Sequence, residues 1–196
     1  MRGNFDWYVG VDEVGRGPIA GPLTVGAVCF NREHPRELIG VRDSKVLSSE
    51  MREKWLGLLK STECSFTTAS VSNQVIDRKG LSYSIRLAIA RALRTLELES
   101  NQTLILLDGG LRAPDCYLHQ ETIIRGDQSE PLIAAASIVA KVHRDKKMIN
   151  LSKRFPQYFF ERHKGYGTKL HYQAIDEHSI SAFHRRTFLP DHLARI

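Results

Sequence analysis

Four acidic residues stand where predicted strands end, so their side chains are candidates for a shared metal site. They are Asp12, Glu13, Asp108 and Asp127. Carboxylates are the hard oxygen ligands that Mg²⁺ and Mn²⁺ prefer in proteins. Each acid also has an ordinary interpretation: solvated acids on an edge strand for the first two, turn chemistry for Asp108, and a helix cap for Asp127. Four acids at strand ends are harder to dismiss together, and we predict one metal cluster.

Asp12 and Glu13 are neighbours on one strand, which limits how they can share a site. Successive strand side chains point to opposite faces, so we expect a twist or bulge if both acids serve one ion. The segment Gly15-Arg16-Gly17 follows directly, and its glycines make such a distortion cheap.

Four acids without a nucleophile fit the hydrolysis of a phosphodiester. Two divalent ions about 4 Å apart can activate water and stabilise the leaving oxygen. The histidines form no H-E-x-x-H or Cys/His zinc pattern, and the sequence contains no P-loop and no G-x-S-x-G segment. We therefore expect Mn²⁺ or Mg²⁺, two per site during catalysis.

Positive charge is concentrated toward the C-terminus. The net charge is +6, and residues 141–196 carry twelve Lys and Arg against five Asp and Glu. Such a basic region can grip a nucleic-acid backbone, although a solvated basic face is the alternative. The candidate substrate contacts are Gly15, Arg16, Gly17, Lys45, Ser137, Lys141, Arg144, Lys164, Tyr166, Arg185 and Arg186.

Four of these contacts keep an open alternative. Ser137, Lys141 and Arg144 recur three and four residues apart on one predicted helix, so this polar stripe faces either phosphates or solvent. Lys45 precedes a helix that Ser48 or Ser49 can cap, and there it either reaches a phosphate or is simply solvated.

Hydrophobic periodicity predicts an α/β domain with a mixed sheet flanked by helices. We expect strands at residues 7–13, 23–30, 64–71, 103–107 and 123–125, and helices at residues 49–60, 81–98, 131–151 and 171–178. The helix over 49–60 should bury Met51, Trp55, Leu58 and Leu59.

Length and composition favour one domain over residues 1–196, with a basic helical substrate-binding part at about 152–196. No apolar run is long enough for a signal peptide or a membrane span, so we expect a cytoplasmic protein with no membrane partner. Three widely spaced cysteines, Cys29, Cys64 and Cys116, are expected to be reduced structural thiols.

Six segments in register resemble ribonuclease HII. They are GVDEVGRGPIAGP from Gly10, Asp43-Ser44-Lys45, Leu107-Asp108-Gly109, Gly126-Asp127, AAASIVAK from Ala134 and His163-Lys164-Gly165-Tyr166-Gly167. The resemblance implies a ribonuclease H-like fold with a C-terminal helical segment, and a monomer. It also implies an endoribonuclease that cuts the RNA strand of RNA/DNA hybrids. In DNA duplexes, such an enzyme incises 5′ of single ribonucleotides and leaves a 3′-hydroxyl and a 5′-phosphate.

Selectivity for RNA must come from groups that touch the sugar, because a metal ion contacts only phosphate. The glycines around Arg16 let the backbone approach a sugar closely. In the resembled family, the loop matching Gly15-Arg16-Gly17 and the tyrosine matching Tyr166 read the junction between a ribonucleotide and the following deoxyribonucleotide.

Two alternatives remain at this point. A non-catalytic nucleic-acid-binding module would need only the basic C-terminal part, but it would gain nothing from four acids near phosphates. Ribonuclease HIII is the nearest relative of the resembled family, and it usually lacks the Gly-Arg-Gly loop that this sequence has.

Overall fold

The computed structural model describes residues 3–33, 35–41 and 44–194; Asp43 of the segment Asp43-Ser44-Lys45 lies outside them. Within these ranges the chain forms a five-stranded sheet of order β3-β2-β1-β4-β5. Its strands are β1 (Trp7–Val14), β2 (Leu23–Phe30), β3 (Ser65–Val71), β4 (Thr103–Asp108) and β5 (Gln120–Ile123). Strands β1, β2 and β3 pair antiparallel, while β4 is parallel to both β1 and β5. This mixed sheet confirms the predicted fold class.

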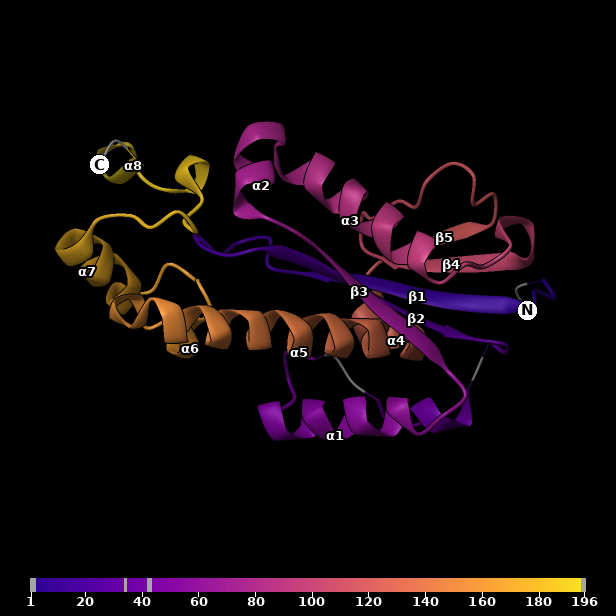
Figure 1. Cartoon of the computed structure of the whole chain (residues 1–196). Helices are drawn as coiled ribbons and strands as arrows, with labels where there is room; N and C mark the ends of the chain where they lie inside the picture. Colours follow the sequence, from indigo (N-terminus) through magenta and orange to yellow (C-terminus); the bar gives the residue numbers. More distant parts are fainter. Residues whose placement is uncertain (1–2, 34, 42–43, 195–196) are drawn as a thin grey trace.

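Helices cover both faces of the sheet (Figure 1). Helix α3 (Leu81–Thr95) lies on one face and α5 (Pro131–Arg154) on the other, with α1 (Ser49–Lys60) outside α5. Strand alternation supplies the two cores: Val9 and Val11 belong to the core on the α3 side, and Tyr8 to the core under α5. The expected helices over 81–98 and 131–151 are confirmed, with ends three residues away at Thr95 and Arg154.

Helix α5 packs against β1 and β2 at two glycines. A Cβ on Gly10 would lie 2.2 Å from the carbonyl of Leu132, and one on Gly26 would lie 2.3 Å from the carbonyl oxygen of Ala136. No side chain fits in either place, so the helix backbone rests directly on the strands. This contact places Asp12, two residues after Gly10 on the same strand face, toward α5.

Helix α1 confirms its predicted cap and corrects its predicted inner face. The Ser48 hydroxyl accepts a hydrogen bond from the Met51 N–H at 3.2 Å. Leu56 and Leu59 are buried, whereas Met51 and Leu58 are each 41% exposed. The face that packs toward α5 is therefore turned from the predicted stripe, because the sequence pattern does not say where α5 lies.

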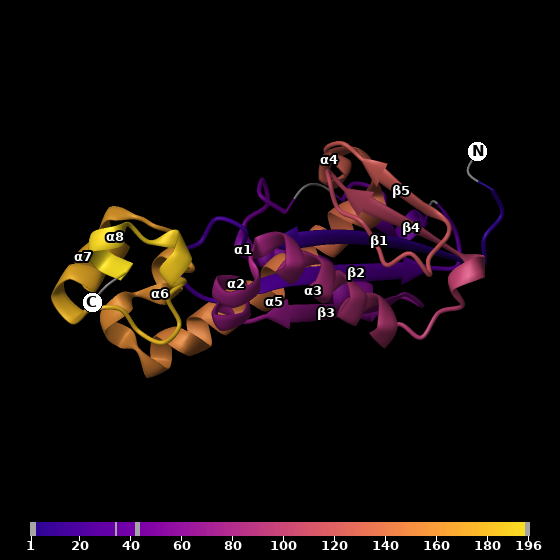
Figure 2. The same ribbon diagram turned by 90° about the horizontal axis from the view of Figure 1, so that it is seen from above.

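The C-terminal part gathers at one end of the molecule, around the distal end of α5 (Figures 1 and 2). It contains α6 (Phe160–His163), α7 (Lys169–His178) and α8 (Asp191–Ala194). Its own buried cluster includes Met148, Tyr158 and Ile175. Within the described residues, the sequence pattern did not predict four short helices: α6, α8, α2 (Asn73–Lys79) and α4 (Gly126–Ser129). Among the described helices, none is long and apolar enough to span a membrane.

Candidate active site

Three of the four predicted acids converge beside the ends of β1 and β4. Oxygen atoms from Asp12, Asp108 and Asp127 can be chosen so that all lie within 4.8 Å of one another. Asp12 lies near the end of β1, Asp108 is the last residue of β4, and Asp127 lies in α4 just after Arg125, whose φ is 55°. The Asp127 N–H donates to Asp108 Oδ1 at 3.3 Å, which joins the two acidic turns. Parallel pairing of β4 with β5 brings these two turns together, and parallel pairing of β4 with β1 places Asp12 beside them.

Glu13, the sequence neighbour of Asp12, is not one of these three converging acids. The β1–β2 ladder runs through both residues, with Asp12 opposite Gly26 and Glu13 opposite Val25. The expected bulge is therefore not found, and Glu13 belongs to the opposite strand face. Its Oε1 accepts from Arg16 Nη1 at 3.1 Å. Its Oε2 is buried and has no hydrogen-bond partner within the described chain.

The acids repel one another electrostatically. Burial, followed by the charges of Glu13 and Asp108, raises the pKa of Asp12 well above its ordinary value. Burial also raises the pKa of Glu13. Like charges held together in a buried place are stabilised by a cation, and every donor here is a carboxylate oxygen. The set of donors therefore fits Mg²⁺ or Mn²⁺. The unpartnered Glu13 Oε2 is suited to be a further ligand of the ion, either directly or through a water molecule.

The glycine loop and Tyr166 lie side by side. A Cβ on Gly17 would be 4.0 Å from Tyr166 Cε1, and the Tyr166 side chain is 42% exposed. The Ile19 N–H donates to the carbonyl of Gly165 at 2.9 Å, so the segment after the loop is bonded to the segment before Tyr166. Within the described chain, no group accepts a hydrogen bond from the N–H of Arg16 or Gly17. The loop thus presents backbone donors beside an exposed aromatic ring.

Arg144 does not occupy the position that the sequence suggested. Its side chain is 0% exposed, and its guanidinium donates only to carbonyls: Pro22 at 2.9 Å, Lys164 at 2.9 Å and Ala20 at 3.4 Å. The predicted phosphate contact does not fit this burial. Arg144 instead ties the end of the glycine loop to the segment around Lys164, because it lies on the α5 face that packs under both.

Arg185 differs from its prediction for the same reason. It is also 0% exposed and donates to the carbonyls of Gly15 at 2.7 Å, Arg16 at 3.1 Å and Gly21 at 3.0 Å. Burial, and then the neighbouring charge of Arg144, lower the pKa of Arg185 to about 9, so it stays protonated at neutral pH. Both arginines hold the glycine loop from behind. Neither guanidinium is exposed for contact with a phosphate.

The remaining basic and polar candidates fall into different environments. Lys45 Nζ lies 2.7 Å from Asp127 Oδ2, beside the acidic cluster. Lys141 pairs with Asp145 at 2.8 Å, and Lys164 donates to the carbonyl of Glu161. Arg186 has an exposed side chain. These groups lie at or near the surface and stay candidates for backbone contacts.

Ser137 faces neither phosphate nor solvent, the two alternatives for its side of the helix. It is buried, and its Oγ shares a 2.7 Å hydrogen bond with Ser44 Oγ. It also hydrogen-bonds the Asp12 carboxylate, which lowers the pKa of that group against the larger effect of burial. Ser137 therefore supports the acid cluster from α5. No sequence pattern indicated this contact, because the helix and the strand come together only in the fold.

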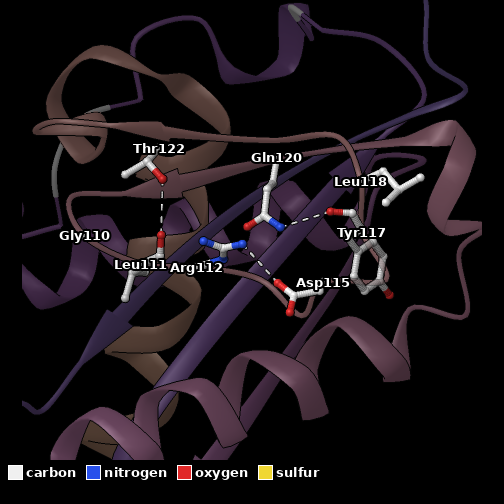
Figure 3. Close-up of a pocket in the computed structure, with 8 residues that line it drawn as sticks. All are labelled: Gly110, Leu111, Arg112, Asp115, Tyr117, Leu118, Gln120 and Thr122. Atoms are coloured by element: carbon white, nitrogen blue, oxygen red, sulfur yellow. Dashed lines mark hydrogen bonds and ion pairs between the residues drawn. The ribbon is translucent and has the colours of Figure 1, made fainter.

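A cavity of about 640 Å³ lies elsewhere, in the loop between β4 and β5 (Figure 3). Arg112 and Asp115 pair across it at 3.1 Å, and Tyr117 and Leu118 line its rim. None of the four acids lines this cavity. A nucleic-acid duplex is far larger than such a space, so the acids beside the ends of β1 and β4 are the candidate active site.

Solved structures share this arrangement of sheet and helices. Ribonuclease H2 of Pyrococcus horikoshii OT3 is similar with a TM-score of 0.75 and 25% identity, over 92% of this chain and 93% of that chain. The ribonuclease HII of Archaeoglobus fulgidus, seen in its complex with PCNA, gives a TM-score of 0.72 and 26% identity, over 87% of each chain. The mixed sheet with its clustered carboxylates defines the class: a metal-dependent nuclease with a ribonuclease H-like fold.

The sequence relationship identifies the family within that class. The sequence model described as Ribonuclease HII matches residues 9–190. The ribonuclease HII of Endomicrobium trichonymphae is 41% identical over 181 residues, which cover 92% of this chain and 84% of that protein. This chain belongs to the ribonuclease HII family. It is a metal-dependent ribonuclease H of type 2, an endoribonuclease that acts on RNA/DNA hybrids, and the alternative of a non-catalytic binding module is set aside.

Proposed function

We propose that this protein incises duplex DNA on the 5′ side of a single embedded ribonucleotide, leaving a 3′-hydroxyl and a 5′-phosphate. Such a cut would start the removal of ribonucleotides from DNA. The observation that carries the proposal is the proximity of Gly17 to the exposed ring of Tyr166, since this pair joins two features expected to read the sugars. We also propose that the protein acts as a monomer in the cytoplasm.

Asp12, Asp108 and Asp127 would hold the metal ions, with Glu13 as the fourth ligand. Two divalent ions, Mn²⁺ or Mg²⁺, would supply an activated water and neutralise charge on the leaving 3′-oxygen. Burial of Asp12 and Asp127 fixes their carboxylates and keeps most water away from them. Lys45, whose Nζ lies 2.7 Å from Asp127 Oδ2, would contact a phosphate flanking the scissile bond.

The glycine loop would supply sugar recognition. The N–H groups of Arg16 and Gly17 are donors suited to a phosphate oxygen or the 2′-hydroxyl oxygen. The carbonyls of Gly15 and Arg16 already accept hydrogen bonds from Arg185, so the N–H groups are the loop's candidate contacts to substrate. The Tyr166 ring would lie against the following deoxyribose, and the 2′-hydroxyl of a ribose at that position would clash with the ring. The Tyr166 hydroxyl would reach the 2′-OH of the ribonucleotide.

The direct test is to map the cut in a DNA duplex that contains one ribonucleotide, with Mn²⁺ or Mg²⁺ present. We expect one product ending in a 3′-hydroxyl immediately 5′ of the ribonucleotide, and no cut in an all-DNA duplex. Cleavage of long RNA/DNA hybrids without any cut at the single ribonucleotide would contradict the proposal.

Tyrosine variants sharpen this test. Tyr166→Ala should lower cleavage at the single ribonucleotide on the order of tenfold or more, since stacking on one sugar or base contributes about 1–3 kcal/mol. Tyr166→Phe isolates the hydroxyl, and Tyr83→Ala removes a similarly exposed tyrosine on α3 as a control. Mn²⁺ affinity should be unchanged in all three. Unchanged junction cleavage in Tyr166→Ala would show that the ring does not read the sugar.

A further inference from the structure

Three histidine rings are buried together beneath Tyr166, away from the acidic cluster. They are His163, His171 and His184, none more than 8% exposed. The rings of His163 and His171 are stacked with centroids 4.2 Å apart. The Nε2 atoms of His171 and His184 are 3.0 Å apart, a hydrogen-bond distance. Nothing in the proposed chemistry at the acids uses these rings.

The partners of His171 and His184 determine which nitrogen of each ring carries the proton. His171 Nδ1 lies 2.9 Å from the carbonyl oxygen of Tyr166, which can only accept, so this nitrogen carries hydrogen. His184 Nδ1 accepts from the backbone N–H of Ser181 at 2.9 Å, so this nitrogen is bare. A neutral His184 therefore carries its hydrogen on Nε2, and a neutral His171 has a bare Nε2 facing it.

The result is one directional chain of hydrogen bonds. The Ser181 N–H donates to His184, His184 Nε2–H donates to His171, and His171 Nδ1–H donates to the Tyr166 carbonyl. Burial lowers the pKa of His171 to about 3 and that of His184 to about 4, which keeps both rings neutral in ordinary assay conditions. An additional proton on either ring would place two N–H groups against each other and break the chain.

The His184 end of the chain is joined to the glycine loop. The backbone N–H of Arg185 donates to the carbonyl of Ile19 at 2.7 Å, and the Arg185 guanidinium donates to the carbonyls of Gly15 and Arg16. Asn73 Nδ2 donates to the carbonyl of His184 at 2.9 Å and fixes the turn from the sheet side. Tyr166 and the glycine loop are thereby held through one buried set of polar contacts.

We propose that His171 and His184 are positioning residues that hold Tyr166 in register with Gly15-Arg16-Gly17 and so set selectivity at the ribonucleotide junction. Neither ring touches substrate. The inference rests on the proposed function for its effect on selectivity, whereas the hydrogen-bond chain itself is a property of the free protein. Substitution of either histidine would therefore change how the protein recognises the sugar, without changing the acidic cluster.

Two substitutions at His184 distinguish the effect of its hydrogen bond to His171 from the effect of its packing. His184→Gln keeps an N–H donor near the Nε2 position. His184→Asn keeps an acceptor near Nδ1 for Ser181 but has no donor that reaches His171. We expect His184→Asn to lower kcat/KM at a single embedded ribonucleotide about tenfold, the effect of one lost buried hydrogen bond. His184→Gln should retain most activity, and Mn²⁺ affinity should be unchanged in both.

A double-mutant cycle with Tyr166→Ala distinguishes positioning from general destabilisation. If His184 acts through Tyr166, His184→Asn should have no further effect on junction cleavage when Tyr166 is already alanine. Equal losses in the Asn and Gln variants, or a full additional loss in the double variant, would overturn the positioning role.

The tautomers can be measured on the wild-type protein, which removes any dependence on variants that fail to fold. Long-range ¹⁵N–¹H correlation spectra should show His171 protonated on Nδ1 and His184 on Nε2 at neutral pH. The opposite tautomer for either ring, or a charged ring, would overturn the chain. Wild-type protein with the expected tautomers that does not cut the single ribonucleotide would instead contradict the proposed function and, with it, the role in selectivity.

Discussion

Two buried groups of like charge lie in this molecule, and they are satisfied in opposite ways. The acids Asp12, Asp108 and Asp127 gather near the end of the sheet, where burial and mutual repulsion raise the pKa of Asp12. The arginines Arg144 and Arg185 lie behind the glycine loop, and each guanidinium donates three hydrogen bonds to backbone carbonyls.

This difference in hydrogen-bonding partners distinguishes the acids, which form a site that needs a ligand, from the arginines, which support the structure. The carboxylates, with the nearby unpartnered Glu13 Oε2, leave negative charge that a cation would stabilise. The arginines leave no such demand, because each of their guanidinium nitrogens donates to a backbone carbonyl oxygen. Charge alone therefore does not identify a binding residue; unsatisfied charge does.

The largest expected effect is on catalysis by the acids. Asp127→Asn removes ligand charge without changing side-chain shape, so we expect activity on an RNA/DNA hybrid to fall on the order of a hundredfold or more. Asp115→Asn is the matched control, since that carboxylate is exposed in the β4–β5 loop and outside the cluster. Steady-state cleavage rates with Mn²⁺ make the comparison, and near-normal turnover of Asp127→Asn would remove this acid from the site.

The next effect is on stability, at the arginines. Arg185→Ala leaves three carbonyls without their donor, and we expect the free energy of unfolding to fall by about 3 kcal/mol. Arg186→Ala, the adjacent arginine with an exposed side chain, should change it by less than about 0.5 kcal/mol. Urea denaturation in the presence of a chelator measures both. Equal stability of the two variants would mean that Arg185 is not a structural support.

The smallest effect concerns the exposed lysines. Lys45→Gln should reduce the slope of log affinity for duplex against log salt by about 0.9, the value for one phosphate contact. Arg94→Gln, at the exposed end of α3 and near the start of β4, should leave the slope unchanged. Substrate binding is measured in Ca²⁺ or with an inactive variant, so that no cleavage occurs. An unchanged slope for Lys45→Gln would place the duplex elsewhere.

Periodicity predicted most of the fold because local patterns reflect local structure. The strands at 23–30 and 103–107 and the helix at 131–151 were all found, since each buries a continuous face. The short helices α2 and α4 were missed, because four to seven residues carry too little pattern. The inner face of α1 was wrong for a different reason: its partner, α5, lies about eighty residues away in the chain.

The acids of the candidate site were predictable from the sequence, but the buried residues that hold the site in place were not. Asp108 ends a strand that the sequence marks clearly, whereas the strand before Asp127 was expected at 123–125 and runs over Gln120–Ile123. The resemblance to a family connected the two acids. Ser137 and Arg185 were assigned to substrate because a polar side chain in a sequence does not reveal what covers it. The histidine chain gave no signal, since its three rings meet only when α6 and α7 fold against the turn at His184.

One measurement tests the contrast between the two groups most directly: unfolding of wild type and Asp12→Asn at increasing Mn²⁺, starting from chelated protein. Because the folded pKa of Asp12 is raised, the folded protein loses stability as pH rises through that pKa, and ionised Asp12 is destabilising at neutral pH. Asn should therefore be the more stable variant without metal, and this advantage should vanish in acid.

Added Mn²⁺ should reverse the order. Wild type gains stability as the ion binds the folded state, whereas Asp12→Asn, with a weakened site, gains little, so the two stability curves cross. Parallel curves, or a less stable Asp12→Asn in chelator, would contradict the view that these acids are held together for a metal ion.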